Sequence, residues 1–211
     1  MHCHRHTASF AQARIRTSRG APTVASWLGP CHASSDAPTD SPAQTDMLAS
    51  STALNCETMK NLLIVAHAPS PNTLKLRDAA ARGAGHEDIE SVSVTIKAPL
   101  EAGPEDVMAC DAILLGTTEN LGYMSGALKD FFDRSYYPIL EEKQGLPCAL
   151  YIRAGQDGTG TRRAVESIVT GLRWNWVQDP MVLRGDWQDD FEQQAEELGM
   201  YLAAGLDAGI L

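Results

Sequence analysis

The chain has 211 residues and a formal net charge of −10 at pH 7, which is enough for one domain of ordinary size with additional sequence. A surface this acidic repels nucleic acid and anionic membranes, so neither is expected as a partner. No apolar run approaches the roughly 20 residues that are needed to cross a bilayer, so no membrane span is expected.

The first 58 residues differ in composition from the rest. They lack hydrophobic periodicity and are rich in Ala, Ser, Thr and Pro, so they cannot bury enough apolar surface to offset the entropy of ordering. We predict that residues 1–58 are a disordered extension, or that the start codon was assigned upstream of the natural one at Met59. A transit peptide is an open alternative, because the first acidic residue is Asp36. Another is a metal-binding tract formed by His2, Cys3, His4 and His6.

Residues 59–211 alternate short apolar runs with amphipathic segments. Strands are predicted at residues 62–66, 91–97, 112–116, 149–153 and 181–183. Helices are predicted at residues 74–82, 104–110, 124–137, 161–174 and 189–204. Because strands and helices alternate, the sheet should be parallel and covered by helices on both faces. We therefore predict an α/β fold, a three-layer sandwich with a five-stranded parallel sheet in the order 2-1-3-4-5.

The five cysteines contain no Cys-x-x-Cys motif. Cys110 precedes one predicted strand and Cys148 precedes another, so both are expected to be buried as small apolar residues. Their odd number and their spacing favour a reducing, cytoplasmic setting.

A turn rich in hydrogen-bond donors follows the first predicted strand. Ser70, Asn72 and Thr73 lie where a helix begins, and a helix N-terminus with adjacent hydroxyl groups is a cradle for phosphate. His67 is a further candidate contact. The alternative is structural: Asn72 caps the helix and Ser70 forms a turn. The turn has neither the Gly-x-Gly-x-x-Gly pattern of a dinucleotide-binding fold nor the Gly-Lys-Ser/Thr of a P-loop.

The turn after the third strand, predicted over residues 116–125, is polar and contains glycine. Ligands of open α/β sheets lie at the carboxyl ends of the strands, and glycine lets backbone amides approach a flat molecule such as a flavin. If Glu119 lies near the ring, its negative charge should lower the reduction potential of the flavin. The alternative is that Glu119 points to water. Ser125 is interpreted as a helix cap, because it is not in a Gly-x-Ser-x-Gly motif. The candidate ring contacts are Thr117, Thr118, Glu119, Asn120, Leu121 and Gly122.

This segment resembles the flavodoxin-like FMN proteins, in particular the NAD(P)H-dependent FMN reductases and quinone reductases. Their pattern is Gly-Thr-Pro, a short stretch with an aromatic residue, Gly, Asn-Met-Ser-Gly, and a helix containing Leu-Lys-x-Phe-x-Asp. The matching residues are Gly116, Thr117, Gly122, Met124, Ser125, Gly126, Leu128, Lys129, Phe132, Asp133 and Arg134. Thr118, Leu121 and Tyr123 depart from the pattern at the proline, the stacking aromatic and the asparagine.

The resemblance implies an oxidoreductase in which bound FMN is reduced by NAD(P)H and reoxidised by a quinone, a flavin or a similar small acceptor. It implies no obligatory side-chain acid or base, a homodimer, and a third turn that covers the pyrimidine edge of the flavin. Gly155, Gln156 and Asp157 are the candidates in that third turn, although a permissive strand-to-helix turn would look the same. Arg153, Arg162 and Arg163 either meet an NADPH phosphate or form a solvated helix start.

Two other functions remain open at this point. One is a flavodoxin-type electron carrier that does not turn over NAD(P)H and docks through its acidic face. The other is a binding or regulatory module that has kept the fold and lost the flavin.

Overall fold

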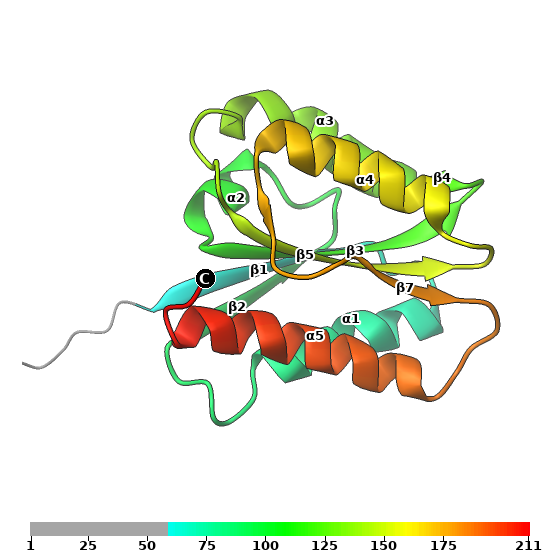
Figure 1. Ribbon diagram of the computed structural model, residues 1–211, viewed down its shortest axis with the longest axis horizontal. Coiled ribbons are helices and arrows are strands. Elements are labelled where there is room, and N and C mark those ends of the chain that lie inside the picture. The colour runs from blue at the N-terminus through cyan, green and yellow to red at the C-terminus, as the bar shows by residue number, and fades with distance from the viewer. Residues whose placement is uncertain (1–58) are drawn as a thin grey trace, which may run out of the picture. The chain divides into compact units, whose positions relative to one another are not determined.

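The computed structural model describes residues 59–211, and the predicted extension over residues 1–58 lies outside this part. Figure 1 shows how the elements of the described part are arranged. In chain order they are β1 (Lys60–Ala66), α1 (Pro71–Ala84), β2 (Val92–Lys97), α2 (Pro104–Ala109), β3 (Ala112–Asn120), β4 (Tyr123–Met124), α3 (Gly126–Ile139), β5 (Pro147–Ala154), α4 (Thr159–Leu172), β6 (Asn175–Trp176), β7 (Met181–Arg184) and α5 (Asp190–Asp207).

The predicted strand order is confirmed. β2, β1, β3 and β5 lie side by side and are parallel, and β6 and β7 both pair with β5. The fifth position is thus filled by two short strands, of which β6 pairs with the start of β5 and β7 with its end. Pro180 lies between them and has no amide hydrogen for the ladder, which accounts for the break.

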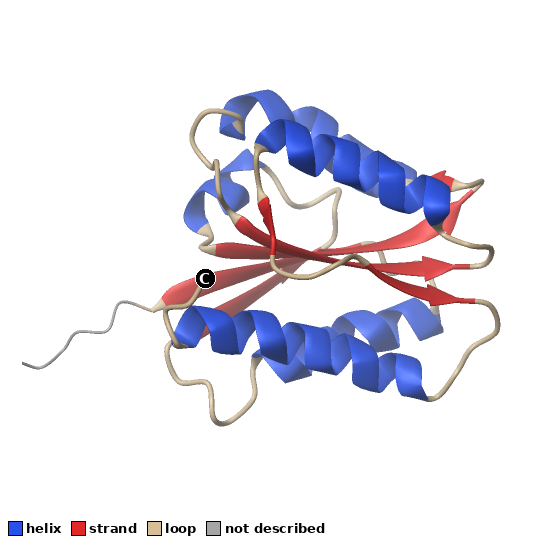
Figure 2. Ribbon diagram, in the orientation of Figure 1, coloured by secondary structure: helices blue, strands red, loops and turns tan. Residues whose placement is uncertain are grey.

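The helices form two layers that cover opposite faces of the sheet. In Figures 1 and 2, α1 and α5 lie on one face, and α2, α3 and α4 lie on the other. Each layer encloses its own apolar core. Cys110 and Cys148 are buried, as predicted, and burial raises the pKa of each thiol to about 12. Both thiols therefore stay protonated and unreactive near neutral pH.

The predicted turn over residues 116–125 is wrong in part. β3 continues to Asn120 and turns back through Leu121 and Gly122 into β4, so that Asn120 faces Tyr123 in an antiparallel pair. Thr117 and Thr118 extend the ladder with β5 beyond the apolar run. The branched side chains of Thr117 and Thr118 favour a strand, although they interrupt the apolar pattern from which the strand was predicted. None of the helices within residues 59–211 is long and apolar enough to cross a membrane.

Candidate functional site

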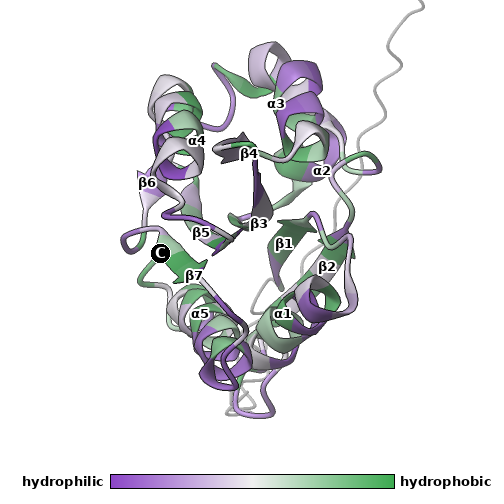
Figure 3. Cartoon of the chain, turned by 90° about the vertical axis from the view of Figure 1, so that its right-hand side faces the viewer, coloured by the Kyte–Doolittle hydropathy of each residue, from purple (hydrophilic) through white to green (hydrophobic). Residues whose placement is uncertain are grey.

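Figure 3 looks onto the edge where the parallel strands end, and there the turns after β1, β3 and β5 are neighbours. The backbone amide of His67, just after β1, donates to the carbonyl of Gly116 in β3 at 2.9 Å. The Glu119 carboxylate, also on β3, reaches the turn after β5. The structure therefore brings together the three turns that hold the predicted site residues.

The turn after β1 is organised by a capping box. Ser70 caps α1: its Oγ accepts the amide of Thr73 at 3.3 Å, and Thr73 Oγ1 accepts the amide of Ser70 at 2.9 Å. These two hydroxyls are therefore engaged within the turn. Asn72 is exposed, and its side chain has no hydrogen bond to any residue of the described part. The interpretation of Asn72 as the cap is wrong, and its amide remains available to a ligand at the start of α1.

His67 lies half-buried at the start of the same turn. Desolvation by burial lowers the pKa of its imidazole from the usual 6.5. The side chain is therefore uncharged at neutral pH and offers a single N–H group rather than a positive charge.

Of the predicted ring contacts on β3, Thr117 is turned toward the protein, whereas Thr118 and Asn120 lie on the other side of the strand. Thr117 is buried; its hydroxyl accepts the amide of Ser125 at 3.2 Å. Ser125 Oγ in turn accepts the amide of Leu128 at 3.2 Å, which confirms Ser125 as the cap of α3. Thr118 Oγ1 donates to Asn120 Oδ1 at 2.7 Å. Thr117 therefore connects β3 to α3, and Thr118 and Asn120 hold each other on the exposed side of the strand.

Glu119 lies against the third turn. Its carboxylate accepts the amide of Gln156 at 2.8 Å and that of Gly158 at 3.2 Å. Asp157 accepts the amide of Thr159 at 2.9 Å, and this hydrogen bond lowers the pKa of Asp157. Glu119 thus does not simply point to water: it occupies two backbone donors of the turn predicted to cover the flavin.

The tip of the β3–β4 hairpin projects from this edge. Leu121 and Gly122 both have a positive φ, of 53° and 73°, which is the conformation that a two-residue hairpin turn requires. The Leu121 side chain is fully exposed. A Cβ at Gly160, in the first turn of α4, would come within 2.0 Å of the Gly122 carbonyl oxygen. Glycine at position 160 therefore lets the hairpin tip pack directly on α4.

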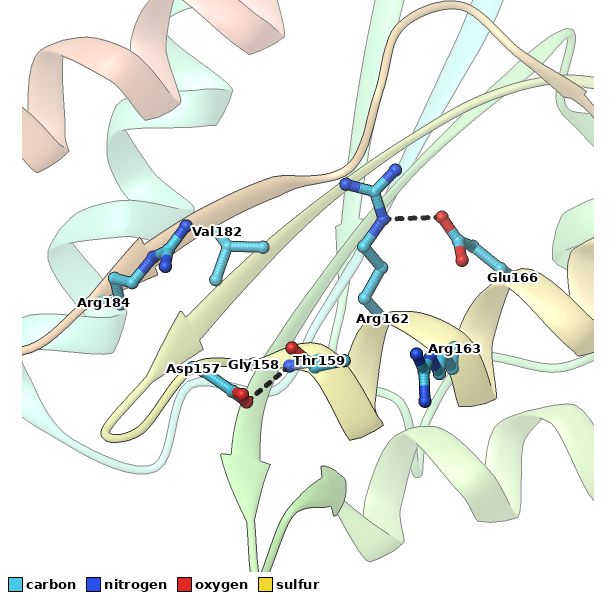
Figure 4. A pocket seen from close by; sticks show the side chains of 8 residues that line it. All are labelled: Asp157, Gly158, Thr159, Arg162, Arg163, Glu166, Val182 and Arg184. Carbon is cyan, nitrogen blue, oxygen red and sulfur yellow. Dashed lines mark hydrogen bonds and ion pairs between the residues drawn. The ribbon is translucent and has the colours of Figure 1, made fainter.

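A cavity of about 320 Å³ lies beside the third turn, between the start of α4 and β7. Figure 4 shows the residues that line it: Asp157, Gly158, Thr159, Arg162, Arg163, Glu166, Val182 and Arg184. Sequence reasoning pointed to Arg162 and Arg163 but missed Arg184, which follows the short apolar run of the last strand.

Arg153, the third arginine considered from the sequence, does not line this cavity. Its guanidinium donates to the carbonyls of Leu183 at 3.2 Å and Gly185 at 2.6 Å. It also lies 5.5 Å from the centre of the Phe191 ring. Arg153 therefore ties β5 to the end of β7 and to α5.

Comparison with solved structures decides the fold. A flavodoxin from the domain Archaea superposes with a TM-score of 0.59 at 18% identity, covering 69% of this chain and 98% of that one. The flavodoxin, WrbA-like protein from Agrobacterium tumefaciens gives 0.58 at 19% identity, covering 71% and 98%. The described part has the flavodoxin-like fold.

Sequence comparison points the same way. A flavodoxin from Aquifex aeolicus (strain VF5) is 31% identical over 114 residues, which cover 54% of this chain. The chain spans 60% of the length of that curated relative. No model of a known protein family matches. In a flavodoxin-like fold, the turns described above lie around the switch point between β1 and β3, where ligands of such sheets bind.

Proposed function

We propose that residues 59–211 bind FMN at this edge and pass electrons from NAD(P)H through the flavin to a quinone, a flavin or a similar small acceptor. The observation that carries the proposal is the direct bonding of the three turns at the switch point, through His67 to Gly116 and Glu119 to Gln156. The names of the similar proteins, flavodoxin and WrbA-like flavodoxin, support a flavin as the ligand.

The first turn fits the phosphate end of FMN. The N-terminus of α1 carries the partial positive charge of the helix, and Asn72 adds an exposed amide without a partner in the described part. Pro69 and Pro71 have no amide hydrogen, and the amides of Thr73 and Leu74 are donated to Ser70. The donors left for a ligand are therefore the side-chain and backbone amides of Asn72. These are neutral donors around a helix end, which suits a phosphate.

The second and third turns fit a flat ring with a polar edge. A Cβ at Gly155 or at Gly122 would meet no atom within 4 Å, so both glycines face open space. The third turn offers the amides of Gln156 and Gly158, although the Glu119 carboxylate has to release them first. Leu121, at the exposed hairpin tip, is placed to cover the face of a ring.

Bound FMN would accept a hydride from NAD(P)H, giving NAD(P)⁺, and then return two electrons, with protons, to the acceptor. The chain accordingly needs to bind the flavin and orient it toward the donor and the acceptor. No residue at this edge is required as an acid or base. The unreactive thiols of Cys110 and Cys148 are compatible with the cytoplasmic location that we propose.

A second candidate is an electron carrier that binds FMN without turning over NAD(P)H. The name of the curated relative, flavodoxin, favours it. Acidic side chains along α5 and at its N-cap could also meet a basic partner. Asp189 and Glu197 form no salt bridge in the described part, whereas Glu192 pairs with Lys75 at 3.2 Å and Glu196 with Arg82 at 3.0 Å.

The two candidates separate in one experiment on the full chain. The protein is mixed with FMN, freed of unbound flavin and tested for visible flavin absorption. NADPH is then added without oxygen. Bleaching on a catalytic timescale supports the reductase, and retained colour supports the carrier. A protein that takes up no FMN overturns both.

A further inference from the structure

We propose that the cavity between α4 and β7 binds the phosphorylated adenosine end of NADPH, with Arg163 and Arg184 as its phosphate ligands. This inference rests on the proposed function, because it assigns the electron donor to a place beside the flavin. The cavity lies next to the third turn: Asp157 and Gly158 belong to both.

The first argument is the local charge. Residues 59–211 contain 13 basic and 23 acidic residues, yet three arginines and only two carboxylates, Asp157 and Glu166, line this cavity. The positive charge of Arg162 is compensated, because its guanidinium pairs with Glu166 at 2.7 Å and lies 3.8 Å from Asp179. Arg163 and Arg184 are exposed and form no salt bridge within the described part. Asp157 is close enough to Arg184 for their charges to attract each other. The residues that line the cavity carry three positive and two negative charges, so one positive charge is left unbalanced among them.

The second argument is where the arginines sit on α4. Arg162 and Arg163 are the fourth and fifth residues of this 14-residue helix, and its first turn has no acidic residue. The N-terminal end of a helix is partially positive, so cations are unfavourable there and anions are favourable. Gly158, the N-cap, supplies no side-chain hydrogen bond, and the carboxylate of Asp157 accepts the first amide of the helix, that of Thr159. An anion bound beside Arg162 and Arg163 would offset the unfavourable position of their charges.

The third argument is size and chemistry. A volume of about 320 Å³ exceeds what a lone phosphate needs and reaches the lower end of small-molecule sites. In Figure 4, Val182 lies between Arg184 and Arg162, which gives the site an apolar wall between charged groups. Guanidinium groups bind phosphate oxygens in a bidentate manner. A phosphorylated nucleoside matches this combination better than a simple anion does.

The test is calorimetry on the full chain, without flavin, with adenosine 2′,5′-bisphosphate as the probe. We expect saturable binding that is weakened at least about tenfold in the double variant Arg163→Gln, Arg184→Gln. Arg173→Gln is the matched control: Arg173 is exposed at the other end of α4, and its replacement should leave the affinity unchanged. AMP, which lacks the 2′-phosphate, should bind at least about tenfold more weakly.

Several outcomes would overturn the inference. They are no binding to the unmodified chain, an equal loss in the Arg173 variant, or an unchanged affinity in the double variant. Equal affinities for AMP and the bisphosphate, or for inorganic phosphate and the bisphosphate, would also exclude this nucleotide site.

FMN uptake, measured on the same proteins, separates this inference from the proposed function. Failure of every protein to bind FMN would overturn the proposed function while leaving the bisphosphate titration interpretable. If FMN binding falls as much as bisphosphate binding in the double variant, the cavity holds the phosphate of FMN and the inference is wrong. Retained FMN binding with lost bisphosphate binding supports it.

Discussion

The Glu119 carboxylate accepts the backbone amide of Gln156 at 2.8 Å, and so the end of β3 is bonded to the turn after β5. The same carboxylate also accepts the amide of Gly158 at 3.2 Å. Charged acceptors make strong hydrogen bonds, so a flavin that needs these amides has to compete with a side chain already in place. Glu119 would thereby oppose the binding of a flavin that used these amides.

Replacing Glu119 by alanine should therefore strengthen FMN binding. We expect about a tenfold lower dissociation constant, because both amides become free and a negative charge is removed. Titration followed by flavin fluorescence measures it. Glu87→Ala is the control, because Glu87 is exposed and has no hydrogen bond in the described part. An affinity that is unchanged or weaker in the Glu119 variant would show that the flavin does not use these amides.

Glu119→Gln separates charge from shape. Glutamine can still accept a hydrogen bond from the third turn, but it carries no charge. We expect the midpoint potential of bound FMN to rise, because the negative charge no longer opposes formation of the anionic reduced flavin. Potentiometric titration of the two proteins measures the difference, and identical potentials would end the idea that Glu119 tunes the flavin.

Asn72→Ala tests the phosphate end of the site. Asn72 is exposed at the start of α1, and the helix is capped by Ser70, so the substitution should not disturb the fold. We expect FMN affinity to fall about tenfold through loss of one hydrogen bond to a charged group. Riboflavin, which has no phosphate, is the control ligand and should bind both proteins equally. A parallel loss for both ligands would place Asn72 elsewhere than on the phosphate.

His67→Gln should change how stability depends on pH. Burial lowers the pKa of His67 below 6.5 in the folded state, so an unfolded chain takes up a proton first as the pH falls. The stabilising contribution of the neutral histidine is present above 6.5 and is lost as the pH falls toward the lower, folded-state pKa. Denaturant unfolding from about pH 7.5 to about pH 5.5 should show the unmodified chain losing more stability than the variant. Parallel pH profiles would contradict this expectation.

The sequence allowed the core of this fold to be predicted because burial imposes a pattern on it. The apolar run from Ala112 to Leu115 and the stripe of Leu128, Phe131 and Phe132 are buried, as expected. The alternation of strands and helices predicted a parallel sheet with helices on both faces, and the strand order was expected because five strands fit the flavodoxin-like order.

The edge of the site was harder to predict. β3 continues through polar residues, because its pairing with β4 and β5 depends on distant parts of the chain. The turn also places Leu121 at a φ of 53°, and leucine gives no signal for that conformation. Arg184 was not predicted as a site residue for a similar reason, because only the folded chain brings β7 beside the start of α4.

Gly116 and Tyr151 are opposite each other on β3 and β5. A Cβ at Gly116 would come within 2.3 Å of the Tyr151 hydroxyl and ring. That hydroxyl is buried and has no hydrogen-bond partner in the described part, and burial raises the pKa of Tyr151, so it stays protonated. Tyr151→Phe should then stabilise the fold by about 1 kcal/mol, because an unsatisfied polar group is removed.

Gly116→Ala should destabilise the protein and displace the carbonyl that receives the His67 amide. Because the obstacle is the packed ring, adding Tyr151→Leu should recover part of the loss. The two substitutions should therefore be non-additive. Denaturant unfolding of the single and double variants measures this coupling, with FMN uptake as a second readout. Additive effects would show that the Tyr151 ring is not what excludes a side chain at position 116. A Tyr151→Phe variant that is less stable than the unmodified chain would show that the tyrosine hydroxyl has a partner.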